Sequence, residues 1–127
     1  MDSNEGVEGR IDCDLDGGVA WLTLRNGRRR NAISLKMAER MVNLCDELDS
    51  NLDIGAVIMQ GEDGYFSSGA ELSVLSKVAE NPAGAAEHEM LSTVYRAFTR
   101  FGELAAPTVA TVAGGAVGAG VNLAFSA

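Results

Sequence analysis

The chain has 127 residues, enough for one domain of ordinary size and too few for two. Hydrophobic residues make up 46% and charged residues 22%, near the averages of globular proteins, so a disordered chain is excluded as the default. The formal net charge of −8 argues against nucleic acid as the main partner, and no apolar run approaches the roughly 20 residues that a membrane-spanning helix needs.

The beginning of the chain predicts a flexible terminus and then a hairpin. Residues 1–9 are polar and acidic, unlike a signal peptide, and we expect them to be flexible, followed by a portion of a single domain over residues 10–127. Two runs of alternating residues, Arg10–Leu15 and Val19–Leu24, flank an Asp-Gly-Gly turn. This pattern is typical of a β-hairpin.

Later elements alternate between helices and short apolar strands. The pattern predicts a helix that has Ser34 as its N-cap and ends near residues 49–51, then a buried strand over 56–60 and helices over 71–78 and 85–104. A buried strand over 108–112 and a helix beginning close to Gly118 are predicted to follow. This order is typical of an α/β fold with mostly parallel strands. Because the last apolar helix has only begun where the chain stops, we expect the N-terminal part of a longer polypeptide.

The cysteines, the histidine and the aromatic residues give little sign of a metal or thiol site. We interpret Cys13 and Cys45 as buried free thiols, which favours a reducing compartment and hence the cytoplasm. The only histidine, His88, is expected on the surface, and one histidine cannot build a multi-histidine metal site. Trp21 and the phenylalanines are expected in the core. No metal is therefore predicted.

Four of the ten basic residues lie within six positions: Arg25, Arg28, Arg29 and Arg30. Arginines concentrated in one turn of an acidic protein can form a local site for an anion. The alternative is a positively charged turn that only faces solvent, and charge alone favours this second interpretation.

Two glycine-rich corners, residues 65–72 and 114–122, each lead from a buried strand toward a helix. Unpaired N–H groups at helix N-termini bind anions, and two neighbouring corners can direct two N–H groups at one oxygen, which is an oxyanion hole. Many such corners only let a helix pack closely on a sheet. A dinucleotide site is disfavoured, because Leu123 stands where the third glycine of the G-x-G-x-x-G fingerprint would be needed.

Taken together, six blocks of sequence resemble the crotonase family, the enoyl-CoA hydratases and isomerases, over about residues 7–127. The blocks are Gly18–Leu24, Arg28–Ile33, Ala56–Gly61, Tyr65–Leu72, Pro107–Val112 and Gly114–Gly120. The resemblance implies a spiral of ββα units, here truncated after the second corner, and assembly as trimers or dimers of trimers. It also implies an acyl-CoA thioester as substrate, with coenzyme A as part of that substrate and no separate cofactor.

The resemblance assigns roles to individual residues. The two N–H donors of the oxyanion hole are expected at Ser68 and Ala119. Residues expected to border coenzyme A are Arg28, Arg29, Arg30, Asn31, Ala32, Ile33, Gly69, Ala70, Leu72 and Gly118. Among these, the resemblance puts Ala70 and Leu72 close to the adenine.

One departure from the family pattern concerns catalysis. The hydratases have a catalytic glutamate two positions after the last glycine of the second corner, and here that position holds Asn122. An amide cannot accept or donate a proton as a carboxylate does. The leading hypothesis is an enzyme that stabilises a thioester enolate. The alternatives are a catalytically silent homologue that binds acyl-CoA or serves as an assembly partner, and a polypeptide with no stable function by itself.

Overall fold

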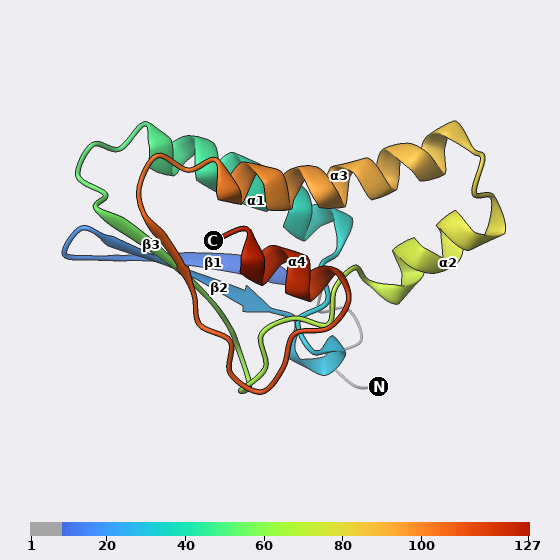
Figure 1. Ribbon diagram of the computed structural model, residues 1–127, viewed down its shortest axis with the longest axis horizontal. Helices are drawn as coiled ribbons and strands as arrows, with labels where there is room; N and C mark the ends of the chain where they lie inside the picture. The colour runs from blue at the N-terminus through green and yellow to red at the C-terminus, as the bar shows by residue number, and fades with distance from the viewer. Residues whose placement is uncertain (1–8) are drawn as a thin grey trace, which may run out of the picture.

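The computed structural model describes residues 9–127, so the predicted flexible segment lies outside the described residues except for Gly9, which is buried. The elements are, in order, β1 (Arg10–Asp16), β2 (Val19–Arg25), the 3-10 turn η1 (Gly27–Arg29), α1 (Leu35–Asp49), β3 (Ala56–Gly61), α2 (Leu72–Glu80), α3 (Ala85–Gly102), β4 (Thr108–Ala110) and α4 (Ala119–Phe125) (Figure 1).

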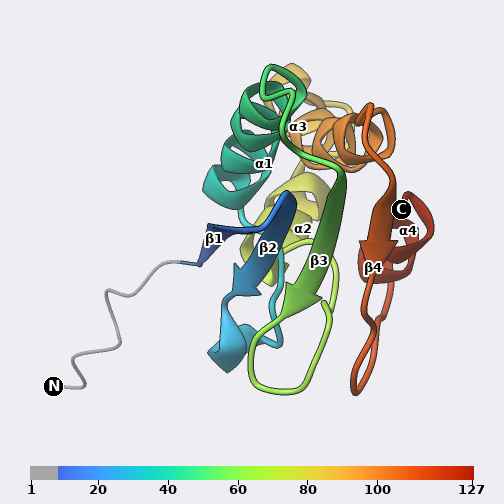
Figure 2. The same cartoon turned by 90° about the vertical axis from the view of Figure 1, so that its left-hand side faces the viewer.

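The four strands form one sheet in the order β1-β2-β3-β4 (Figure 2). The first two strands are antiparallel and joined by a two-residue turn, Gly17-Gly18, in which both residues have positive φ angles, as hairpin turns of this length require. The β2–β3 and β3–β4 pairs are parallel. The predicted hairpin and the predicted parallel neighbours are both confirmed.

Helices α1 and α3 run side by side along one face of the sheet (Figure 1). The first helix begins at Ser34, whose side chain accepts the N–H of Met37 at 3.1 Å, as predicted for its N-cap. The core lies between these helices and the sheet, and its fully buried larger side chains include Leu22, Met37, Met41, Met59, Val94 and Phe101.

An ionic clamp joins the C-terminal ends of α1 and α3. Arg100 donates to Asp46 at 2.9 Å and to Asp49 at 2.6 Å, and Asp49 also accepts the backbone N–H of Ala105 at 3.0 Å. These hydrogen bonds stabilise the charged carboxylate: the Ala105 N–H and then the Arg100 guanidinium lower the pKa of Asp49 below its ordinary value.

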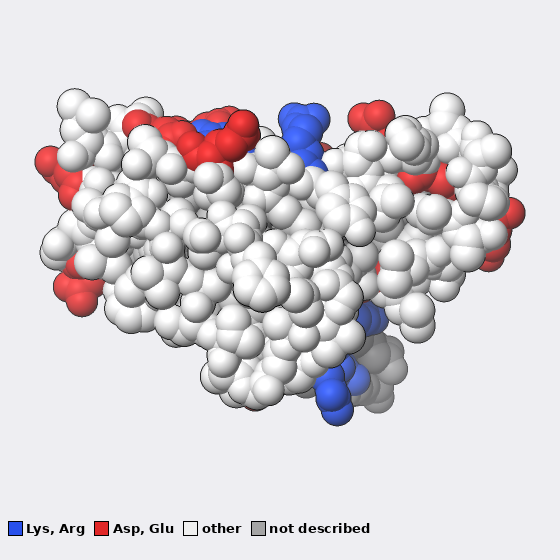
Figure 3. Space-filling model, viewed as in Figure 1, with Lys and Arg blue, Asp and Glu red and all other residues white. Residues whose placement is uncertain are grey.

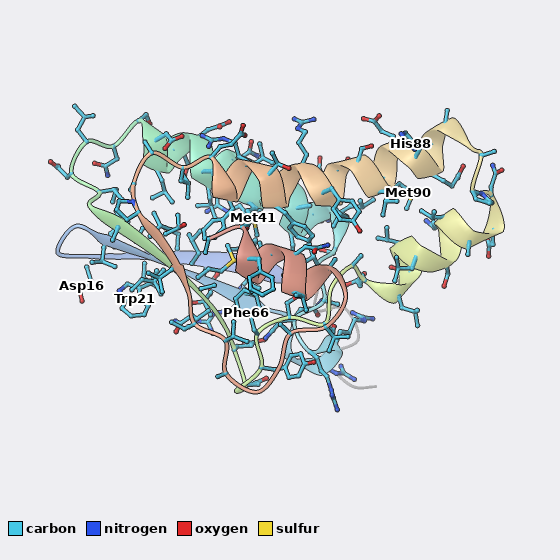
Figure 4. All side chains as sticks on the ribbon, in the orientation of Figure 1. Asp16, Trp21, Met41, Phe66, His88 and Met90 are labelled. Carbon is cyan, nitrogen blue, oxygen red and sulfur yellow. The ribbon has the colours of Figure 1, made fainter. Side chains whose placement is uncertain are left out.

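The opposite face of the sheet is only partly covered within the described residues, and this corrects three predictions. The strands expected to be buried on both faces instead alternate: Val57 is fully buried, whereas Val109 is 50% exposed. Trp21 is half-buried and lies on the side away from α1 and α3 (Figure 4). Phe125 is 84% exposed. Short apolar runs do not reveal whether a second layer covers them.

The two cysteines differ more than predicted. Both are free thiols, but only Cys45 is fully buried, whereas Cys13 is half-buried. Burial raises the pKa of Cys45 to about 12, so this thiol stays protonated at neutral pH. In the described part of the chain, no helix has the length and apolar character required to span a membrane.

Candidate active site

The two glycine corners meet along an extended segment, residues 66–70. On one side this segment pairs with the second corner: the N–H of Phe66 donates to the carbonyl oxygen of Gly115, and the N–H of Val117 donates to that of Ser67, each at 3.0 Å. A Cβ on Gly120 would overlap the carbonyl group of Ser67. The segment and the start of α4 are therefore in direct backbone contact.

On its other side, the same segment pairs with the residues that follow the arginine turn. The N–H of Ser68 donates to the carbonyl oxygen of Arg30 at 2.9 Å, and the N–H of Ile33 donates to that of Gly69 at 2.7 Å. Glu71 closes the pairing by donating its N–H back to the carbonyl oxygen of Ile33 at 2.9 Å. The segment thus joins the arginine turn to the second corner.

This pairing is at odds with the role predicted for Ser68. Its N–H is already used in the bond to Arg30, so it is not available to a ligand in this conformation. Several backbone N–H groups in the two corners donate to no protein acceptor among the described residues, and those of Ala70 and Ala119 are two of them. Of the two predicted donors, only Ala119 has an N–H group without an acceptor in this structure, and the N–H of Ala70 is a further donor without one.

The free N–H of Ala70 has a defined direction. In a trans peptide group the C=O and N–H bonds point to opposite sides. Because the carbonyl oxygen of Gly69 points at Ile33, the N–H of Ala70 in the same peptide points away from Ile33. A Cβ on Gly69 would lie 3.0 Å from the nitrogen of Ala119, so the two free donors belong to backbone segments in close approach. Gly69 also has φ +100°, which disfavours other residues.

Sequence reasoning could not distinguish Ser68 from Ala70. In a regular extended segment, residues two apart direct their N–H groups to the same side. The positive φ of Gly69 breaks that regularity, so one N–H is bonded and the other is free. The glycine itself was the available signal, but its φ angle cannot be read from the sequence.

The arginine turn consists of η1 and the next residues, Arg30 and Asn31, which have positive φ angles of 52° and 56°. Arg28, Arg29 and Arg30 are all exposed, and the Arg30 guanidinium lies 5.5 Å from the centre of the Tyr65 ring. In Figure 3, basic side chains lie at the lower right, over η1, and also at the top, where acidic side chains lie close to them. The exposed arginine side chains offer positive charge to an anion, although the carboxylate of Glu62 also contacts the turn through the N–H of Gly27.

The remaining predicted binding residues differ in accessibility. Asn31, Ala32, Ile33 and Gly69 are buried, so these residues offer little or no accessible surface to a ligand in this conformation. Ala70 is half-buried, Gly118 is exposed and Leu72 is 75% exposed.

Asn122 is exposed on α4, three residues after Ala119 and therefore on the same side of the helix. Its amide cannot act as a general acid or base as a carboxylate does. His88, exposed as predicted, lies on α3 far from Phe66 of the first corner (Figure 4). Within residues 9–127, no group of three potential ligands could hold a metal ion.

Comparisons with known proteins identify the family and the fold. Residues 14–127 match the model of the enoyl-CoA hydratase/isomerase family. A probable enoyl-CoA hydratase of Mycobacterium tuberculosis is 34% identical over 113 residues, which are 89% of this chain and 43% of the relative. A peroxisomal Delta(3,5)-Delta(2,4)-dienoyl-CoA isomerase of Arabidopsis thaliana is 26% identical, over 89% of this chain and 44% of the relative.

Solved structures of enoyl-CoA hydratases and isomerases have the same fold as this chain. The crystal structure of an enoyl-CoA hydratase from Polaromonas sp. JS666 superposes with a TM-score of 0.84 at 25% identity, over 93% of this chain and 46% of that one. An enoyl-CoA hydratase/isomerase from Xanthobacter autotrophicus Py2 has a TM-score of 0.82 at 28% identity, over 92% of this chain and 43% of that one. The chain thus spans less than half the length of these relatives.

Proposed function

Because the chain belongs to the enoyl-CoA hydratase/isomerase family, with the crotonase-like α/β fold predicted from its sequence, we propose that it forms part of an enzyme acting on acyl-CoA thioesters. The observation that carries the proposal is the pair of unpartnered N–H groups, at Ala70 and Ala119, on two backbone segments in close approach. We propose that these groups, rather than those of Ser68 and Ala119, receive the thioester carbonyl oxygen.

The chemistry follows from where charge develops. When a proton leaves the carbon next to a thioester carbonyl, or a nucleophile adds to the conjugated double bond, negative charge collects on the carbonyl oxygen as an enolate. Two fixed N–H groups stabilise that oxygen more strongly than they stabilise the neutral carbonyl, and this difference lowers the barrier. Backbone donors suit the role because they need no reorganisation during the reaction.

The arginine turn is the proposed binding region for the phosphates of coenzyme A. Guanidinium groups bind phosphate through charge and paired hydrogen bonds, and Arg28, Arg29 and Arg30 are exposed for such contacts. The turn is joined to the Ala70 segment by the bond from the Ser68 N–H to the Arg30 carbonyl. A single extended ligand can therefore contact both regions.

The sharpest test removes one donor and keeps the side chain small. Ala119 is the first residue of α4, a position where proline is well tolerated because its φ angle suits a helix and the missing N–H is unpaired there. We expect Ala119→Pro to reduce turnover of an acyl-CoA thioester by about 10²–10³-fold, the usual cost of losing one oxyanion-hole donor. Ala119→Ser keeps the N–H and is the matched control.

The measurement is steady-state turnover on a panel of enoyl-CoA and acyl-CoA esters, with the folded state of each variant checked by circular dichroism. Equal turnover for Ala119→Pro and Ala119→Ser would refute the proposed role of the Ala119 N–H.

The identity of residue 122 affects which reaction of the family the site can catalyse. An amide can orient water or substrate by hydrogen bonds, but general acid–base catalysis contributes typically about 10²–10⁴-fold to a rate. We expect hydration of short enoyl-CoA esters to be far slower than in hydratases with two catalytic glutamates, and Asn122→Glu to raise it. Hydration at ordinary family rates with Asn122 in place would contradict this expectation. Asn122→Gln, which is longer but still an amide, is the control.

The second candidate function is a catalytically silent homologue that binds acyl-CoA or serves as an assembly partner. Asn122 is the observation that favours it, since the amide removes one acid–base group while the free N–H pair remains. Measurable binding of acyl-CoA without turnover of any member of the panel would favour this candidate.

Assembly and location complete the proposal. We infer a trimer or a dimer of trimers from the family resemblance, and a cytoplasmic location supported by two free thiols. Sedimentation of the purified protein tests the first inference.

A further inference from the structure

Ser67 has no part in the function proposed above, yet its side chain is fully buried in the same extended segment as Ala70. Its hydroxyl donates to the carbonyl oxygen of Asn31 at 2.9 Å and accepts the N–H of Gly69 at 3.1 Å. One hydroxyl therefore connects the end of the arginine turn to the glycine that immediately precedes Ala70.

Gly69 is the residue whose backbone most directly controls the Ala70 N–H. Rotation about its φ and ψ angles turns the peptide group that carries this N–H relative to the preceding peptide, and a glycine resists such rotation least because it has no Cβ. Two hydrogen bonds hold Gly69. Its N–H donates to the Ser67 hydroxyl, and its carbonyl oxygen accepts the N–H of Ile33. Only the first of these depends on a side chain.

The acceptor of the Ser67 hydroxyl is itself firmly held. Asn31 is fully buried, and its side-chain amide donates to the carbonyl oxygens of Glu62 at 3.0 Å and Tyr65 at 2.8 Å. Its side-chain oxygen accepts the N–H of Asn26 at 2.9 Å. Because these bonds fix Asn31, the Ser67 hydroxyl is anchored at one end and can restrain Gly69 at the other.

We propose that Ser67 is a positioning residue that directs the Ala70 N–H at the thioester carbonyl oxygen by restraining Gly69. The inference rests on the proposed function, because the carbonyl is the ligand of that N–H. A hydroxyl with a merely structural role would stabilise the fold without altering the polarisation of a bound carbonyl, and this difference makes the two roles separable.

The first experiment measures that polarisation. Crotonyl-CoA labelled with ¹³C at the thioester carbonyl is bound to the full chain, and the fall in carbonyl stretching frequency is recorded by infrared difference spectroscopy. We expect Ser67→Ala to lose about half of the shift, since one of two donors is misdirected, while the Kd for free CoA changes less than about twofold. Ser73→Ala, which deletes an exposed hydroxyl bonded to Glu71, should leave the shift unchanged.

A stability control separates positioning from unfolding. Val94→Ala truncates a fully buried side chain on α3, away from the Ser67 contacts, and should lower the Tm without changing the carbonyl shift. A full shift in folded Ser67→Ala would overturn the inference. Failure of the wild-type chain to bind crotonyl-CoA, or binding with no shift, would instead overturn the proposed function.

The second experiment needs no ligand. Backbone ¹⁵N relaxation of the free chain reports the order of the Gly69 and Ala70 N–H groups on the picosecond to nanosecond timescale. We expect lower order parameters at both residues in Ser67→Ala and unchanged ones in Val94→Ala. Unchanged order at Gly69 and Ala70 in Ser67→Ala would show that the hydroxyl does not restrain the segment, which overturns the inference whatever the result with crotonyl-CoA.

Discussion

The two corners that supply the proposed N–H donors are held in place by different means. The first corner is fixed by side chains: the amide of Asn31 and the hydroxyl of Ser67 bond to its backbone. The second corner, around Gly118 and Gly120, has only backbone–backbone hydrogen bonds to the first among the described residues. The first corner should therefore be sensitive to the loss of a polar group, and the second to the addition of a carbon atom.

The largest expected effect comes from adding a carbon to the second corner. In Gly120→Ala the new Cβ would overlap the backbone carbonyl of Ser67, which cannot move without breaking the pairing between the corners. We expect a loss of about 3 kcal/mol or more in the free energy of unfolding, measured by urea denaturation.

Gly118→Ala is the matched control for that experiment. At Gly118 the nearest atom to a new Cβ is 3.9 Å away, so only the positive φ of 56° opposes the substitution. With ψ at −128°, Gly118 lies in a backbone region that other residues rarely adopt, and this conformational cost is about 1–3 kcal/mol. Equal losses for the two variants would show that the corners do not touch as tightly as described here.

Deleting a side chain from the first corner should have the next largest effect. Asn31→Ala removes an amide with three hydrogen bonds and leaves their buried backbone partners unsatisfied. We expect a loss of about 2–3 kcal/mol in the free energy of unfolding. Asn31→Gly tolerates the positive φ better, so it should be slightly less destabilised than the alanine variant. Asn51→Ala, which loses one exposed hydrogen bond to Asp53, should change stability little.

The pattern of these interactions explains how much of the fold could be predicted. Helices α1 and α3 were predicted to within a few residues, because three- and four-residue periodicity records one buried face. The exposed fractions of Trp21 and Val109 were not predicted. A run such as Ala56–Met59 is apolar whether one or both faces of the strand are covered, so the sequence does not distinguish the two cases. Local sequence reports on a strand's own residues and not on the layer opposite.

Part of the candidate site could likewise be predicted from the sequence, and part could not. The two corners could be located from glycine content, since a close approach of backbones requires glycine, whereas the donor role of Ala119 stays a prediction from the resemblance. The sequence could not show that the N–H of Ser68 is bonded while that of Ala70 is free, because this difference depends on the φ of Gly69 and on which N–H finds a carbonyl in the arginine turn. The positioning hydroxyl of Ser67 could not be inferred either, because its partners are 2 and 36 positions away in the sequence.

The smallest expected change in stability lies outside both corners, in the ionic clamp between α1 and α3. This change should depend on pH. The bonds from Ala105 and Arg100 lower the pKa of Asp49 in the folded chain. A carboxylate with a lowered pKa stabilises the fold above its unfolded pKa of about 3.9, and that contribution disappears as the pH falls through the folded value. Asp49→Asn should cost about 1 kcal/mol or less near pH 7, because the pair is partly exposed.

The difference in Tm between wild type and Asp49→Asn should therefore be constant from about pH 7 down to pH 5 and shrink below about pH 4. Asn31→Ala provides the contrast, because its buried bonds involve no group that titrates in this range, so its Tm deficit should persist in acid. A deficit for Asp49→Asn that stays constant down to pH 3 would mean that the charge of Asp49 does not stabilise the clamp. A deficit for Asn31→Ala that shrinks in parallel would mean that the first corner depends on an acidic neighbour, with Glu62 and Glu71 as the carboxylates that contact the turn.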